Sequence, residues 1–160
     1  MTTRRLISPS AIIYTLAAVV LLVISAASAE RKIKRSDLPA AVQAAVAAQS
    51  RGAEVRGFSE EKENGHTYYE AELQVGGHSK DVLMDTEGKI VEIEEEVALD
   101  ALPASVREGL LAKASSSKLV KVESLTKQGK LMAYEAQVIA KGKKSEIQVG
   151  PDGKPLDHTE

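Results

Sequence analysis

Residues 38–42 read Leu-Pro-Ala-Ala-Val, and residues 102–106 read Leu-Pro-Ala-Ser-Val. Other segments recur in the same order: Asn64-Gly65 as Gln128-Gly129, residues 69–73 (YEAEL) as 134–138 (YEAQV), and Gly88-Lys89 as Gly153-Lys154. The spacing between the copies is constant apart from one inserted residue. Such an ordered set of matches predicts one structural unit written twice, over residues 36–97 and 98–160.

Each copy is expected to begin with an amphipathic helix. In the first copy Asp37 and Pro39 precede the apolar run, and an acid followed by proline is typical of a helix start. Apolar residues then recur at spacings of three and four, which places them on one face of a helix. The stripes consist of Leu38, Val42, Ala45 and Val46 in the first copy, and of Leu102, Val106, Leu110 and Ala114 in the second.

Antiparallel strands are expected after each helix. Asn64-Gly65 is a strong hairpin signal because both residues tolerate positive φ. In the following segment Tyr69 and Ala71 alternate with Tyr68 and Glu70, and this period of two predicts a strand buried on one side. We therefore predict an α+β fold of two tandem repeats, each with one helix packed on a four-stranded antiparallel meander sheet.

The two repeats are expected to be lobes of one body. The joint between them, residues 97–101, is short, and aromatic residues make up only 3% of the chain. A unit of about 60 residues buries only about 60% of the surface that its unfolded chain exposes, so it is marginally stable alone. In the second copy the last strand is expected to be truncated or lost, because Pro155-Leu156-Asp157 is a poor match for the last strand of the first copy.

The N-terminal segment has the three parts of a secretory signal peptide. Arg4 and Arg5 precede an uncharged apolar run, which ends in a small-x-small sequence at Ala27 and Ala29. We predict a signal peptide over residues 1–29, cleaved after Ala29, and a basic disordered lead over residues 30–35. The alternative is a retained membrane anchor, because the run is just long enough to span a bilayer. Either reading places the remainder in the periplasm or outside the cell, and a membrane contact is expected only with the anchor.

Composition excludes several classes of function. The chain contains no cysteine, which excludes disulfides, thiolate metal sites, a cysteine nucleophile and a lipid-modified cysteine. The formal net charge is −2, and the only charged residues before Glu30 are basic, so the remainder is more acidic still. A nucleic-acid partner is not expected, since it requires a clustered basic surface.

No motif in the chain indicates catalysis, a metal or a cofactor. His66, His78 and His158 lack the spacing of a metal site, and no serine lies in a Gly-x-Ser-x-Gly context. The acidic run at residues 92–96 is interpreted as a solvated rim. The turn at Asp85 lacks the alternating ligands of a calcium loop, so we expect Asp85 to accept backbone N–H groups there.

A candidate partner surface lies on the outward side of the predicted strands. If the helices cover one face of the sheet, the alternate residues face outward, and an exposed tyrosine beside acids can anchor an interface. The candidate residues are Tyr68, Glu70, Glu72, Gln74, Glu135 and Gln137.

Several of these segments together resemble the PepSY-like family. They are LPAAV at residues 38–42, YYEAEL at 68–73 and VLMDTEGKI at 82–90, and the resemblance covers most of residues 36–157. The chain is also similar to the related beta-lactamase-inhibitor-like fold, which is built from two such units. The resemblance implies a non-catalytic module that binds and occupies an exported protein, often a protease. It carries no catalytic residues to this chain.

The sequence thus leads to an exported binding module that inhibits or regulates an exported protein such as a peptidase. Two alternatives stay open: a sensor or carrier for a small ligand or cation in the envelope, and a membrane-tethered accessory subunit.

Overall fold

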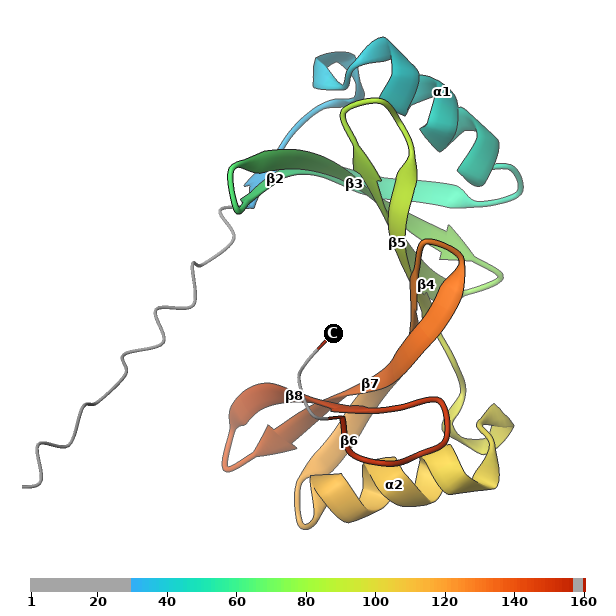
Figure 1. Ribbon diagram of the computed structural model, residues 1–160, viewed down its shortest axis with the longest axis vertical. Helices are drawn as coiled ribbons and strands as arrows, with labels where there is room; N and C mark the ends of the chain where they lie inside the picture. Colours follow the sequence, from blue (N-terminus) through green and yellow to red (C-terminus); the bar gives the residue numbers. More distant parts are fainter. Residues whose placement is uncertain (1–29, 157–159) are drawn as a thin grey trace, which may run out of the picture.

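The protein is described by a computed structural model, which covers residues 30–156 and residue 160. The predicted signal peptide and its cleavage site at Ala27 and Ala29 lie outside the described residues. The described residues form two α-helices and eight strands, and each helix is followed by a run of consecutive strands (Figure 1). The strands form a single antiparallel sheet in the order β1-β2-β3-β4-β5-β6-β7-β8, so each strand pairs with its neighbours in the sequence.

The first half contains β1 (Arg31–Lys32), the short 3-10 turn η1 (Arg35–Asp37), α1 (Ala40–Gln49), β2 (Glu54–Glu63), β3 (His66–Val75), β4 (His78–Asp85) and β5 (Ile90–Glu96). The second half contains the 3-10 turn η2 (Leu99–Ala101), α2 (Ala104–Ala114), β6 (Lys118–Lys127), β7 (Lys130–Ala140) and β8 (Lys143–Val149).

Two details of the predicted layout are wrong. Residues 30–35 were expected to be disordered, but Arg31 pairs with Glu60 and Lys32 with Ser59, so the lead adds a strand to the sheet. Four strands in each repeat is also wrong for the second half, where the described residues form three, and the expected truncation or loss of its last strand is confirmed. Pro155 makes only an isolated bridge to Val149, because a proline lacks the N–H that a ladder requires.

The predicted hairpins are confirmed. Asn64 and Gly65 have φ of 51° and 81°, and Gln128 and Gly129 have φ of 50° and 78°, as a tight hairpin between twisted strands requires. The prediction for Asp85 is also confirmed. Its Oδ1 accepts the backbone N–H groups of Glu87 at 2.9 Å and Lys89 at 3.0 Å, which closes the turn between β4 and β5.

Each helix packs on its own half of the sheet and closes its own core. Val42 and Val46 of α1 are fully buried, as are Val106 and Leu110 of α2. The first core contains Leu38, Phe58, Tyr69, Ala71, Leu73, Val82 and Met84 beside the α1 valines. The second contains Leu102, Val122, Ala136 and Val149 beside the α2 residues. The apolar stripes predicted from the sequence therefore face the cores.

A turn that contains glycine packs closely against the backbone of each helix. A Cβ on Gly88, after β4, would lie 2.6 Å from the carbonyl oxygen of Ala41 in α1. A Cβ on Gly153, after β8, would lie 2.1 Å from the carbonyl oxygen of Ser105 in α2. The two glycines hold equivalent places in the two halves, and only a residue without a side chain permits this approach.

The halves are joined by direct pairing of β5 with β6, where Glu92 lies opposite Lys127 and Glu96 opposite Glu123. The sheet therefore runs without interruption from one half to the other. It curves so that both helices lie on its outer, convex side (Figure 1). Among the described residues, no helix covers the opposite, concave face.

Candidate functional site

The six residues predicted as a partner surface all lie on the concave face. Glu70 pairs with Ser59 of β2 and Leu83 of β4, on the side away from the buried Tyr69 and Ala71. The pairing continues through Glu92 of β5 to Lys127 of β6. Directly opposed residues in antiparallel strands point to the same side. By this register the face includes Tyr68, Glu70, Glu72 and Gln74 from β3, and Glu135 and Gln137 from β7.

Hydrogen bonds fix several of these carboxylates. The buried hydroxyl of Ser59 donates to Glu70 at 2.8 Å. In the other half, the amide nitrogen of Gln148, which is 6% exposed, donates to Glu135 at 2.7 Å. Each bond joins a carboxylate to a neighbouring strand and restricts its side chain. Both halves therefore present oriented acids to the same concavity.

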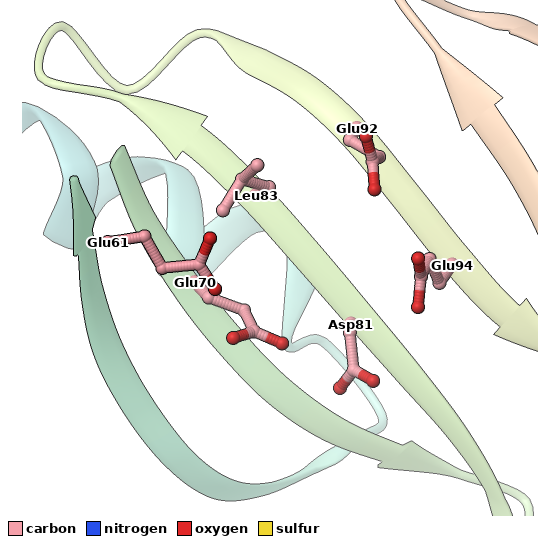
Figure 2. Close-up of a pocket in the computed structure, with 6 residues that line it drawn as sticks. All are labelled: Glu61, Glu70, Asp81, Leu83, Glu92 and Glu94. Carbon is pink, nitrogen blue, oxygen red and sulfur yellow. The ribbon is translucent and has the colours of Figure 1, made fainter. Parts of the chain in front are cut away.

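An acidic trough lies at the centre of the first half of this face. It is a hollow of about 240 Å³ whose lining comes from four neighbouring strands (Figure 2). Five of its six lining residues are acids: Glu61 of β2, Glu70 of β3, Asp81 of β4, and Glu92 and Glu94 of β5. The sixth is Leu83. The acidic trough denotes these six residues below.

Burial and neighbouring carboxylates, inside and outside the trough, oppose the ionisation of its acids. Burial, with repulsion by Glu123 and Glu135, raises the pKa of Glu94 to about 8. Burial, with repulsion by Glu70 and Glu123, raises the pKa of Asp81 to about 6. Burial and the neighbouring Glu70 raise the pKa of Glu61 in the same direction. The trough therefore crowds carboxyl groups together, and Asp81 and Glu94 keep their protons to a higher pH than free carboxyl groups do.

Lysines compensate the carboxylates beside the trough. Lys121 Nζ lies 2.6 Å from Glu123, whose side chain is almost completely buried. Lys32 forms ion pairs with both Glu30 and Glu72. Two groups of three acids place one oxygen each within 4.8 Å of the others: Glu30, Glu70 and Glu72, and Asp81, Glu94 and Glu123. Each group thus contains at least one carboxylate that already pairs with a lysine.

Most of the trough was not predicted from the sequence. Residues 92–96 were interpreted as a solvated rim, whereas Glu92 and Glu94 are half-buried on the concave face. One signal was available, because Ile93 alternates with Glu92 and Glu94 and packs against the first core. The raised pKa of Glu94 depends on its burial and on carboxylates in β4, β5, β6 and β7, which no local pattern indicates.

The remaining candidates do not gather at a site. His66 and His78 are exposed and lie at the starts of β3 and β4. His66 contacts Tyr68, with ring centroids 6.3 Å apart, and His78 Nδ1 lies 3.9 Å from Glu96. His158 lies outside the described residues.

The raised pKa values give the protein a pH-dependent stability. Between its ordinary value of 4.5 and about 8, Glu94 binds a proton in the folded chain but not in the unfolded one. Stability therefore falls as the pH rises through this range, and Asp81 adds to the fall up to about pH 6. The backbone N–H of Ser79 lowers the pKa of Glu96. Glu96 therefore makes stability rise with pH, but only at a pH below its ordinary pKa of 4.5.

We expect the free energy of unfolding to decrease by on the order of 1–2 kcal/mol between about pH 5 and pH 8, after allowance for partial solvent screening. Denaturant unfolding at a series of pH values measures it. Glu94→Gln keeps the volume and removes the charge, so it should raise stability near pH 8 and flatten the slope. Glu87→Gln, on an exposed turn residue, is the matched control and should keep the slope. A stability that rises with pH over this range contradicts the assignment.

Comparisons with known proteins bear on the fold. No sequence family and no curated protein matches the chain. Solved structures do. A beta-lactamase-inhibitor-like (BLIP-like) protein from Bacteroides fragilis superposes with a TM-score of 0.56 at 21% identity, over 74% of this chain and 83% of that one. The fold is BLIP-like.

Two further structures agree with this assignment. A protein from Bacteroides eggerthii, provisionally described as periplasmic, gives a TM-score of 0.61 at 22% identity, over 74% of this chain and 86% of that one. A DUF2874 family protein from Bacteroides ovatus gives a TM-score of 0.57 at 20% identity, over 75% of this chain and 85% of that one. At such identities the likeness concerns the BLIP-like fold alone. Within the described residues, no helix has the length and apolar character needed to cross a bilayer.

Proposed function

We propose that this chain is an exported, non-catalytic binding protein made of two PepSY-like repeats, which inhibits or regulates an exported protein such as a peptidase through its concave face. The equivalent packing of Gly88 on α1 and Gly153 on α2 supports the two repeats. The signal-like sequence before Glu30 supports export to the periplasm or beyond.

One observation carries the proposal: both helices lie on the convex side, and among the described residues no helix covers the concave face of the eight-stranded sheet (Figure 1). An antiparallel sheet with one solvated face needs only scattered polar residues there. This face instead holds oriented carboxylates and a half-buried tyrosine, Tyr68, within one cupped surface. A cupped face matches a protrusion on a partner better than a flat surface does.

A divalent cation is a second candidate, favoured by the two groups of three carboxylates. Oxygen ligands suit calcium or magnesium. The ion pairs of Lys121 with Glu123 and of Lys32 with Glu72 weigh against it, because each ammonium group already neutralises one of the three acids. Addition of a chelator to the purified protein tests it, and a lowered melting temperature would favour a bound cation.

Capture from the native envelope tests the main proposal. The protein is immunoprecipitated from the envelope fraction of its own cells, and the recovered proteins are identified by mass spectrometry. We expect one exported protein to be enriched, and Tyr68→Ala to reduce its recovery. Leu111→Ala is the matched control, since Leu111 is a 49% exposed apolar residue on α2, outside the concave face. Equal recovery with both variants would place the interface elsewhere.

A further inference from the structure

The C-terminal end of the chain returns to the concave face. After β8 the chain reverses in a tight turn, where the N–H of Gly150 donates to the carbonyl oxygen of Lys154 at 2.8 Å. Beyond this turn, the backbone N–H of Glu160 donates to the side-chain oxygen Oε1 of Gln148 at 2.9 Å. Figure 1 shows the C-terminal end on the concave side of the sheet. Part of the concave face is therefore in contact with the chain's own backbone.

Gln148 is a buried acceptor that a neighbouring side chain orients. It is 6% exposed and lies opposite Glu135 of β7. Its amide nitrogen donates to Glu135 at 2.7 Å. A carboxylate accepts hydrogen bonds and does not donate them, so the nitrogen of the amide must face Glu135 and the oxygen is directed away from it. The oxygen that meets the N–H of Glu160 is thus held in place by a second hydrogen bond.

The fold does not require an amide at this position. Leu83 holds the equivalent place in the first half, where it lies opposite Glu70 as Gln148 lies opposite Glu135. An apolar side chain therefore suffices for the same strand pairing. A buried polar group costs free energy unless its hydrogen bonds are made. The second half carries this cost and offers an acceptor that Leu83 lacks, which indicates that a specific donor belongs there.

The donor identifies the class of ligand. Glu160 donates through its backbone N–H, which every residue except proline possesses. Gln148 therefore recognises the main chain of a polypeptide. The concave face continues beside it along β8, because Glu146 lies on the same side of the strand two residues earlier. A hollow of about 270 Å³ lies there, lined by Gln137, Lys144, Ser145 and Glu146. An extended segment that reaches Gln148 has room to continue into this hollow.

We propose that the second half of the concave face is a receptor for the main chain of an extended peptide segment, with Gln148 as its acceptor, and that the chain's own Glu160 occupies it in the free protein. The inference rests on the proposed function, because it assumes that the partner binds the concave face. It adds a regulation of that face: a partner that reaches Gln148 must first displace Glu160. One hydrogen bond between neutral groups is weak enough to be displaced.

Deletion of residues 157–160 tests the occupancy in the free protein. Amide chemical shifts of the shortened protein are compared with those of the full chain. We expect the resonances of Glu135 and the side-chain amide of Gln148 to move, whereas the resonance of Leu83 in the first half stays. Unchanged resonances throughout β7 and β8 would show that Glu160 does not occupy the site, and they would overturn the proposal.

A peptide with the sequence of residues 155–160 tests recognition from outside the chain. We expect it to shift β7 and β8 resonances of the shortened protein and to bind the full chain about tenfold more weakly, as for a site that is occupied about nine-tenths of the time. The same peptide N-methylated at its last residue lacks the donor and should bind neither protein. Absence of binding to the shortened protein, equal binding to both proteins or equal binding of both peptides would overturn the proposal.

A substitution in the full chain provides a test that does not depend on the shortened protein. Gln148→Met keeps a side chain of similar length and removes the acceptor. The backbone amide of Glu160 should then exchange its hydrogen with solvent about tenfold faster than in the unchanged protein. Gln49→Met, the same substitution at a half-buried position of α1, is the matched control and should leave this exchange unchanged. An equal effect of both variants, or none from Gln148→Met, would contradict the proposal.

The peptide titration needs no partner, so its failure is distinguishable from failure of the proposed function. Capture through Tyr68, which lies in the first half, tests the partner separately. If capture succeeds while the peptide does not bind, the receptor is overturned and the proposed function stands. If capture fails while the peptide binds the shortened protein as expected, the receptor stands without the proposed protein partner.

Discussion

Gly153→Ala should be among the most destabilising single substitutions in this chain, with a loss of about 3–5 kcal/mol in the free energy of unfolding. Two causes act together. Gly153 has φ of 83°, where a side chain is strained. An added Cβ would also lie 2.1 Å from the carbonyl oxygen of Ser105, in the first turn of α2, and backbone on both sides prevents an easy shift.

Two companion variants separate these causes. Gly129→Ala has a similar φ of 78° but open space around the added Cβ, so it should cost only about 1 kcal/mol. Gly109→Ala lies within α2, where alanine normally stabilises a helix by about 1 kcal/mol over glycine. Its Cβ would lie 2.0 Å from the carbonyl oxygen of Gly153, so we expect a large loss instead. Denaturant unfolding measures all three. Similar losses in Gly153→Ala and Gly129→Ala would show that the turn does not pack on α2.

Tyr69→Ala and Tyr68→Ala should give opposite results although the residues are adjacent. Tyr69 is 9% exposed and belongs to the first core, where truncation of a large aromatic costs about 3–5 kcal/mol. Tyr68 is half-buried on the concave face and touches His66, so its truncation should cost about 1 kcal/mol or less.

Thermal and denaturant unfolding of the two variants provide the measurement, and partner capture provides the second readout. We expect Tyr69→Ala to unfold early and Tyr68→Ala to stay folded with reduced capture. Equal loss of stability in both would refute the assignment of faces on β3, and with it the position of the concave face.

Local sequence patterns predicted the elements that short-range chemistry determines. Asn64-Gly65 and Gln128-Gly129 specify tight hairpins by their backbone preferences, and the spacing of Val42 and Val46 specifies a helical face. The alternation around Tyr69 predicted a common face for Tyr68, Glu70, Glu72 and Gln74, and the strand pairing places these four residues on one side of the sheet. These signals lie within a few residues of one another in the chain.

Non-local features were missed for a physical reason. Arg31 and Lys32 form a strand only because Glu60 and Ser59 lie beside them, and two basic residues carry no strand pattern of their own. The pairing of β5 with β6 joins segments separated by a whole helix, and it turns two expected lobes into one sheet. The acidic trough depends on this assembly, since Glu94 gains Glu123 and Glu135 as neighbours only across that joint.

Site-specific photocrosslinking tests the central claim, partner binding through the concave face, most directly. A benzophenone amino acid replaces Tyr68 on the concave face in one strain and Leu111 on α2 in another, each in the full chain produced in its own cells. We predict that illumination links the Tyr68 position to one exported protein and the Leu111 position to none. Equal adducts at both positions, or an adduct at Leu111 alone, would contradict the account.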